Sequence, residues 1–308
     1  VCFADIGNQV VCVDKDKNKI DKLNSGISPI YEPGLDELIQ KNFTAKRLSF
    51  TSNIDRAINT SDIIFICVGT PTKKGSIKVD LSFVYKCTKE ILKYSKRKKI
   101  IITKSTVPVG TGDEIEKILK KKKKLFTVIS NPEFLREGEA IRDFRYPDRI
   151  VIGSNEKRTF NIMRKLYAPL TNKGSKFFTT SRRGAELIKY ASNAFLATKI
   201  TFINELANLC EKSGVNIEDI SLGMGSDSRI GGRFLRAGPA YGGSCFPKDT
   251  KGLVSAAEKY KINLSVVKSV IKSNKERVNL LTQRSHKILV SNLKNKKISF
   301  LGVTFKPN

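Results

Sequence analysis

The chain has 308 residues, 40% of them hydrophobic, and its 57 Lys and Arg against 29 Asp and Glu give a formal net charge of +28. This length and apolar content exclude a largely disordered chain and predict two domains with part of a third. No apolar run reaches the ~18–20 residues of a membrane span, so we expect no membrane partner. The six cysteines form no CxxC pair or Cys/His cluster, so we expect no metal site and a cytoplasmic protein.

The first 180 residues alternate short β-branched runs with helical stretches. The predicted strands are 10–13, 62–69, 99–104, 126–130 and 149–153, with 48–51 and 176–180 as further candidates. The predicted helices are 16–25, 81–94, 111–122 and 157–167. This alternation predicts a Rossmann-type α/β domain over residues 1–181, built on a parallel sheet with crossover helices.

The first residues are typical of the interior of a dinucleotide-binding unit. Val10–Val13 followed by Asp14 has the pattern of that unit's second strand and its acidic residue, with Val1–Gly7 as the end of the preceding helix. We therefore expect the Gly-rich phosphate loop upstream of residue 1. An Asp after a strand is also a common turn residue.

From residue 184 the pattern becomes helical. The segment 184–211 is apolar almost all round, which predicts a helix buried on most sides that joins two domains or forms a subunit interface. Further helices are expected at 217–222, 250–260 and 264–293. The sequence thus predicts an all-helical central domain over 182–294, and a new strand at 297–302 that opens a second α/β domain over 295–308.

Cys245 lies in the segment GPAYGGSCFPKD, residues 238–249. Gly242, Gly243 and Pro247 oppose regular structure there, so we expect the thiol on a tight loop. Lys248 supplies a cation that favours a reactive thiolate. The alternative is an unreactive cysteine buried in a loop, which is a common fate of this residue.

Lys189 and Asn193 are four residues apart and share one face of the long predicted helix, with Glu186 and Asn204 on or near the same stripe. Buried polar side chains need partners, which a polar substrate or an internal salt bridge would supply. His286 is the only histidine, so acid–base chemistry falls to Lys, Asp, Glu or water.

Three polar, proline-containing segments follow predicted strands: Val68–Thr72, Lys104–Pro108 and Asn131–Gly138. Ligands of parallel sheets bind at this carboxyl edge, so the three segments predict a site. The positive charge has two interpretations, a polyanion-binding surface or a lysine-rich exterior. The scattered lysines favour the second, without nucleic acid, although the field would attract a small anionic substrate.

The motifs VCVD, YEPGL, VGTPT, TKSTVPVGT, SNPEFLREG, PDRIVIG, KYASNAFLATKI, GSDSRIG, GGSCFPKD and FLGVTFKPN together resemble the UDP-glucose/GDP-mannose dehydrogenase family, in its order and spacing. The resemblance implies an NAD-dependent four-electron oxidation of UDP-glucose to UDP-glucuronate through a thiohemiacetal and a thioester on Cys245. It also implies a homodimer through the central helix. The alternatives are GDP-mannose or another nucleotide sugar as substrate, and a non-catalytic polyanion-binding Rossmann protein.

The resemblance assigns each role by position. Cys245 is the nucleophile, Lys189, Asn193 and Asp249 serve the alcohol oxidation, Glu133 assists thioester hydrolysis, and Thr106 positions water or Glu137. The residues expected at NAD are Asp14, Lys19, Val68, Gly69, Thr70, Pro71, Thr72, Ser105, Thr106 and Glu137. Those expected at the sugar nucleotide are Glu133, Phe134, Leu135, Arg136, Glu137, Lys189, Asn193, Arg229, Phe234, Leu235, Gly238, Tyr241, Gly242 and Lys306, with Arg229 reaching a neighbouring subunit.

Overall fold

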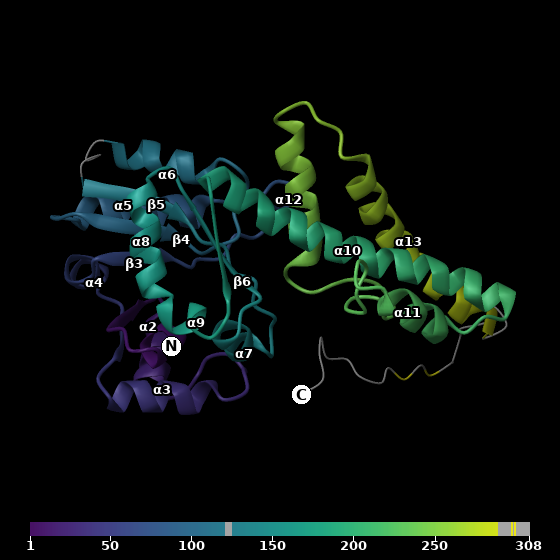
Figure 1. The fold of residues 1–308 in the computed structure, drawn as a ribbon, viewed down its shortest axis with the longest axis horizontal. Helices are drawn as coiled ribbons and strands as arrows, with labels where there is room; N and C mark the ends of the chain where they lie inside the picture. Colours follow the sequence, from purple (N-terminus) through teal and green to yellow (C-terminus); the bar gives the residue numbers. More distant parts are fainter. Residues whose placement is uncertain (121–124, 289–296, 298, 300–308) are drawn as a thin grey trace. The chain divides into compact units, whose positions relative to one another are not determined.

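The structure is a computed structural model that describes residues 1–120, 125–288, 297 and 299 (Figure 1). It divides into two compact units. Unit 1 comprises residues 1–70 and 80–189, and unit 2 comprises residues 71–79 and the described residues from Tyr190 onward. The boundary falls inside one continuous helix, α10 (Arg182–Ser213).

Unit 1 contains two sheets. Strands β1 (Val10–Val13) and β2 (Leu48–Thr51) pair in parallel, with Val10 opposite Leu48. The second sheet has the order β3-β4-β5-β6-β7, formed by Ile63–Ile66, Lys99–Thr103, Phe126–Ser130, Arg149–Ser154 and Lys176–Thr180. All the strands predicted for residues 1–181 are present, although β3 ends three residues before the predicted run 62–69 does.

Helices cover both faces of the five-stranded sheet. Alternate residues of each strand point to opposite faces. The helices of unit 1 that precede α10 are α1 (Cys2–Asp5), α2 (Lys17–Asn24), α3 (Leu35–Thr44), α4 (Ile54–Thr60), α5 (Ser82–Tyr94), α6 (Thr111–Leu119), α7 (Ala140–Arg145), α8 (Lys157–Leu166) and α9 (Ala168–Thr171). Ile101 and Val128 therefore pack against α4, α5 and α6, whereas Ile102 and Ile129 pack with α1, α7, α8 and α9.

The expected parallel sheet is present, and it also contains one antiparallel pair of strands. Strands β3, β4 and β5 are parallel to one another, but β6 pairs antiparallel with β5. The only helix between β5 and β6 is α7, which has 6 residues. At ~1.5 Å per residue it rises about 9 Å, too little to return along a strand of about 20 Å. The last residues of β6, Gly153 and Ser154, therefore lie opposite the last residues of β5, Ser130 and Ile129.

Unit 2 is helical, with the later part of α10 followed by α11 (Ile217–Ser226), α12 (Phe246–Glu258) and α13 (Ser265–Ile288). The strand predicted at 297–302 and the domain predicted over 295–308 fall almost entirely outside the described residues. Within the described ranges, no helix is both long and apolar enough to cross a bilayer.

One face of α10 departs from the expected burial on most sides. Phe195, Phe202 and Leu209 are 66%, 47% and 63% exposed in the single chain. These residues are seven apart, so they form one stripe along the helix. The opposite side carries the buried residues Asn193, Ala197 and Asn204. The apolar residues of α10 are therefore divided between a buried face and an exposed stripe.

Candidate active site

The carboxyl ends of β3 and β4 are tied together by hydroxyl groups. The Ser105 hydroxyl donates hydrogen bonds to the carbonyl oxygens of Val68 and Ile66, at 2.7 and 3.2 Å. The Thr70 hydroxyl donates to the carbonyl oxygen of Thr106 at 2.9 Å. The predicted cofactor segments 68–70 and 105–106 thus lie side by side at this edge of the sheet. Gly69 is exposed there.

Asp14 follows β1, and its carboxylate lies 2.8 Å from the Lys19 ammonium group at the start of α2. The hydrogen bond from Lys19 is the main cause that lowers the pKa of Asp14, so the carboxylate is ionised and accepts hydrogen bonds. A carboxylate at this strand end fits the paired hydroxyls of an NAD ribose. Pro71 and Thr72 belong to unit 2, where Thr72 pairs with Val79.

The loop after β5 places Glu133 beside Lys189. One Glu133 oxygen accepts the Leu135 amide at 2.8 Å, and the other lies 3.6 Å from the Lys189 ammonium group. Lys189 is only 4% exposed and also lies over the Phe134 ring at 5.3 Å. Arg149 stacks on the same ring at 4.2 Å. A buried cation is thus held between a carboxylate and an aromatic ring.

The same loop, which includes Glu137, is anchored by a carboxylate that sequence reasoning did not select. The Glu32 carboxylate accepts the amides of Gly138 and Ala140, at 2.9 and 2.7 Å. Arg136 donates to the Asp143 carboxylate at 2.6 Å, so its guanidinium is engaged within the loop. Glu32 lies in the quoted YEPGL motif, but more than a hundred residues separate it from its partners.

Lys104, at the end of β4, is a second basic group near Glu133. Burial lowers the pKa of Lys104 to about 8, opposed by the charges of Glu133 and Cys67 and reinforced by that of Lys189. The sequence alone places Lys104 in the polar segment after a strand and gives it no separate role. Its position after a buried strand, directly before Ser105, is the sequence feature that identifies it.

In unit 2, Asn193 and Asp249 form a buried pair. The Asn193 amide group donates to Asp249 at 2.6 Å, and the Lys248 ammonium group lies 2.9 Å from the other Asp249 oxygen. Asp249 is 1% exposed. Protein groups therefore supply partners for both Lys189 and Asn193 on α10.

Cys245 is the N-cap residue of α12 and is exposed, with its sulfur 3.6 Å from the Ser244 hydroxyl. Cys245 thus ends the turn 243–245, as expected for a thiol on a tight loop, but the helix expected from residue 250 already begins at Phe246. Pro247 lies in the first turn, where no amide partner is needed, so it starts the helix instead of interrupting it.

The segment just before Cys245 is held by side chains of α10 and α13. The Gly238 amide donates to Asn204 at 2.7 Å. Asn274 bonds both the amide and the carbonyl oxygen of Tyr241, at 2.8 and 3.0 Å, and Arg277 donates to the Gly238 carbonyl oxygen at 3.2 Å. These four bonds fix the backbone that leads to the thiol. The two anchors from α13 were missed because they lie over thirty residues away.

The other predicted substrate residues of unit 2 differ in their surroundings. Phe234 has φ +66° and packs edge-on to Phe246 at 6.0 Å. Leu235 is buried, and its carbonyl oxygen accepts the Ser221 hydroxyl at 2.6 Å. Arg229 is exposed and paired with Asp227 at 2.6 Å. Gly242 is exposed, and Lys306 lies outside the described residues. In the described ranges, no group of His, Cys, Asp and Glu could hold a metal ion.

Residues 1–171 match the NAD binding domain of the UDP-glucose/GDP-mannose dehydrogenase family, and residues 183–276 match its central domain. A Rossmann-type domain with an acidic residue after β1 and a polar strand edge defines an NAD-dependent oxidoreductase. The chain belongs to the UDP-glucose/GDP-mannose dehydrogenase family, and NAD is its cofactor.

Individual relatives agree with this assignment. The chain is 49% identical to a UDP-glucose 6-dehydrogenase of Rhizobium meliloti, covering all of this chain and 71% of the relative, and 46% identical to YwqF of Bacillus subtilis, covering 70%. A UDP-glucose dehydrogenase structure from Pyrobaculum islandicum superposes with a TM-score of 0.89 at 35% identity. The match covers 94% of this chain and 67% of that structure's chain. A GDP-mannose dehydrogenase structure from Pseudomonas aeruginosa matches 95% and 68%, with a TM-score of 0.71 and 32% identity.

Proposed function

We propose that this protein oxidises the C6 alcohol of UDP-glucose to the carboxylate of UDP-glucuronate. The observation that carries the proposal is the match along the whole chain, at 46–49% identity, to relatives named UDP-glucose 6-dehydrogenase. Bound NAD supplies the hydride acceptor for each of the two oxidations. Asp14, with the segments 68–70 and 105–106, supplies hydrogen-bonding groups for the cofactor.

The chain's own residues carry the remaining chemistry. As the alcohol is oxidised, Lys189 stabilises the negative charge on its oxygen, with Asn193 as a further donor, and Asp249 takes the proton through water. The Cys245 thiolate then forms a C–S bond to the aldehyde carbon, whose oxygen takes a proton, giving a thiohemiacetal. Oxidation of this adduct leaves a thioester.

Water then adds to the thioester, the C–S bond breaks, and the acid leaves as the thiol is restored. Glu133 is suited to direct that water, since its carboxylate already accepts hydrogen bonds beside Lys189. Cys245, the N-cap residue of α12, is exposed, so its sulfur is accessible to the aldehyde. Each of these roles is a proposal from the family motif and from the chemistry of the group.

A panel of sugar nucleotides tests the substrate. The purified protein is given UDP-glucose, UDP-N-acetylmannosamine and GDP-mannose with NAD, and the products are identified by mass spectrometry. We expect UDP-glucose to have the highest kcat/KM, with UDP-glucuronate as product. A higher kcat/KM for GDP-mannose would replace the proposed substrate with the alternative that the family allows.

We also propose that the protein is a homodimer through α10. Phe195, Phe202 and Leu209 expose one apolar stripe along this helix, and such a stripe is covered well by a second copy of itself. Phe195→Glu combined with Phe202→Glu should give monomers in sedimentation velocity. Ile162→Glu, an exposed position on α8, is the control. A monomeric wild type would contradict the proposal.

The six free cysteines support a reducing cytosol as the compartment.

A further inference from the structure

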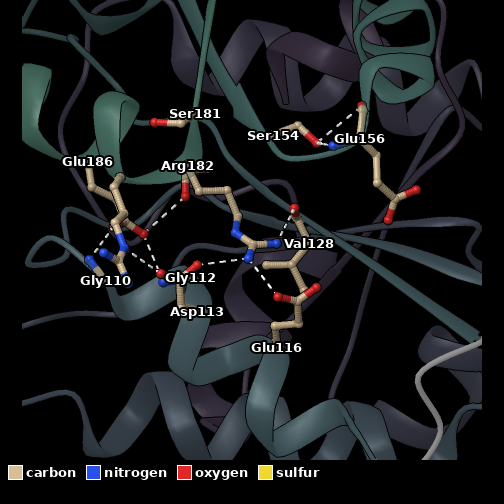
Figure 2. A network of polar contacts seen from close by, with 12 residues as sticks. Gly110, Gly112, Asp113, Glu116, Val128, Ser154, Glu156, Ser181, Arg182 and Glu186 are labelled. Atoms are coloured by element: carbon tan, nitrogen blue, oxygen red, sulfur yellow. Dashed lines mark hydrogen bonds and ion pairs between the residues drawn. The ribbon is translucent and has the colours of Figure 1, made fainter.

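Glu186 is a buried carboxylate for which the proposed reaction has no role. It lies on α10, three residues before Lys189, and is 3% exposed. One of its oxygens accepts the Gly110 amide at 2.7 Å, and the other accepts the Gly112 amide at 2.8 Å and the Ser130 hydroxyl at 3.1 Å. Figure 2 shows the carboxylate pointing at the two amides.

The two amides belong to the start of α6, with Gly110 as its N-cap residue. The first amides of a helix lack partners within the helix. Glu186 therefore caps α6 from a different helix, and the ionised form suits this role because all three of its partners donate.

The glycine at position 112 matches this arrangement. A Cβ there would lie 3.0 Å from the Glu186 oxygen and 3.3 Å from the Ser130 hydroxyl oxygen. A side chain would therefore press on the carboxylate. Gly110 has φ +94°, a conformation that side chains disfavour.

The capped turn connects directly to the cofactor edge. The Thr111 amide and hydroxyl both donate to the Pro108 carbonyl oxygen, at 3.1 and 2.6 Å. Pro108 lies two residues after Thr106, whose carbonyl oxygen holds Thr70. A shift of the first turn of α6 would thus move Ser105 and Thr106.

We propose that ionised Glu186 is a positioning residue, which fixes the Ser105–Thr106 segment by holding the start of α6 against α10. The inference rests on the proposed function, which gives Ser105, Thr106 and Lys189 their roles. Glu186 itself touches neither substrate nor cofactor, so its effect passes through the backbone of residues 105–112.

Burial is the main reason that the carboxyl group of Glu186 titrates near neutral pH. Burial raises the pKa of Glu186 to about 7, opposed by the bonds from Gly110, Gly112 and Ser130 and reinforced by the charge of Asp113 on α6. Asp113 is itself paired with Arg182 and Arg183, and Glu116 with Arg182 (Figure 2). From α5, the Tyr85 hydroxyl bonds Glu114, and the charge of Glu186 contributes to raising the pKa of Tyr85.

The test compares the wild type with Glu186→Gln, Ser130→Ala and the control Glu116→Gln. Glu116 is a partly exposed residue of the same helix α6 and bonds Arg182. The kcat/KM for UDP-glucose is measured from pH 6 to pH 9, and hydrogen–deuterium exchange is measured for the amides of residues 104–112. The exchange experiment needs neither substrate nor cofactor.

Glu186→Gln should lower kcat/KM at pH 8 by about tenfold, the effect of roughly one lost hydrogen bond to a charged group. Its acidic limb near pH 7 should disappear, and the amides of Gly110 and Gly112 should exchange about tenfold faster. Ser130→Ala keeps the carboxylate but removes a donor that lowers the pKa of Glu186. Its acidic limb should therefore move to higher pH. Glu116→Gln should match the wild type in both measurements.

An unshifted acidic limb in Ser130→Ala, or wild-type exchange in folded Glu186→Gln, would overturn the inference. If Glu186→Gln does not fold, Ser130→Ala decides. If the wild type leaves UDP-glucose unoxidised, the proposed function fails, but the exchange data still test whether Glu186 holds the start of α6. Protection of residues 104–112 that depends on Glu186 supports this positioning role, and protection that does not depend on Glu186 overturns it.

Discussion

At the residue scale, Lys189 combines burial with a full set of neighbours. Its ammonium group lies 3.6 Å from Glu133 and over the Phe134 ring, with only 4% of the residue exposed. A buried ion pair contributes little net stability, because desolvation offsets the attraction. A cation kept in such a place is better explained by chemistry on an oxygen that becomes negative.

Lys189→Ala should therefore lower kcat more than it raises KM for UDP-glucose. In the proposed mechanism the charge acts mainly as the oxyanion develops, and a loss confined to the transition state appears in kcat. Removing one such donor typically lowers kcat about 10²–10³-fold. Steady-state kinetics at saturating NAD measure this, with Lys199→Ala as a control on the same helix. A change in KM alone would make Lys189 a substrate-binding residue.

Glu186 should also give folding stability a pH dependence of defined sign. The pKa of its carboxyl is raised from 4.5 to about 7 in the folded state. Its contribution to stability is thus complete below about pH 4.5 and is lost as pH rises through about 7. Relative to that of Glu186→Gln, the free energy of unfolding of the wild type should fall by up to about 3 kcal/mol as pH rises from about 4.5 to about 7. Urea unfolding at pH 5, 6, 7 and 8 measures the difference, and parallel curves for the two proteins would contradict the prediction.

At the scale of elements, local sequence patterns predict where the helices and strands lie better than they predict how these elements pair. Runs of β-branched residues place the strands, and the long Pro-free run places α10. The direction of β6 is not contained in its own residues, since it depends on the short α7 that precedes it. The early start of α12 was predictable, because Pro247 is a residue typical of a first helical turn.

Part of the candidate site was also predictable. Buried Lys189 and Asn193 required partners, but no local pattern identifies Glu133 or Asp249 as those partners. Glu32 and Asn274 bond loops far away in sequence. Such contacts depend on the tertiary structure, and the spacing of residues in a single sequence does not show which distant residues meet. The exposed stripe of α10 was not predicted, because the apolar composition of the helix does not show which of its residues are buried within the chain.

The loop before Cys245 offers a test at this scale. Asn274→Leu removes both bonds to the Tyr241 backbone, so the segment that leads into α12 is released. We expect kcat to fall about tenfold and stability to fall by roughly 1–3 kcal/mol, because two backbone groups lose their partners. Steady-state kinetics and thermal unfolding measure these changes. Asn279→Leu, an exposed position on α13, is the control, and equal effects from both substitutions would refute the anchoring role.

At the scale of the whole molecule, the net charge of +28 is the unusual property. A field of this sign attracts anionic sugar nucleotides as well as nucleic acid. Several of the basic side chains are engaged in ion pairs, among them Arg136, Arg182 and Arg229. This engagement favours a solvated basic exterior over a dedicated polyanion site.

We therefore expect only weak, salt-sensitive binding to nucleic acid. Contacts to phosphates alone give a Kd on the order of 10⁻⁴–10⁻⁶ M at physiological salt, and affinity falls as salt rises. Titration with duplex DNA and with RNA at ~150 mM salt measures this. Sequence-selective binding below micromolar concentration would revive the polyanion-binding alternative.

The central claim is a four-electron oxidation that passes through Cys245. The most direct measurement is the ratio of NADH to UDP-glucuronate formed by the wild type and by Cys245→Ser. We predict two NADH for each UDP-glucuronate in the wild type. The variant should form no acid above a trace, because serine is a much weaker nucleophile at neutral pH. One NADH per sugar with aldehyde as the final product, or acid formed by Cys245→Ser near the wild-type rate, would contradict the account.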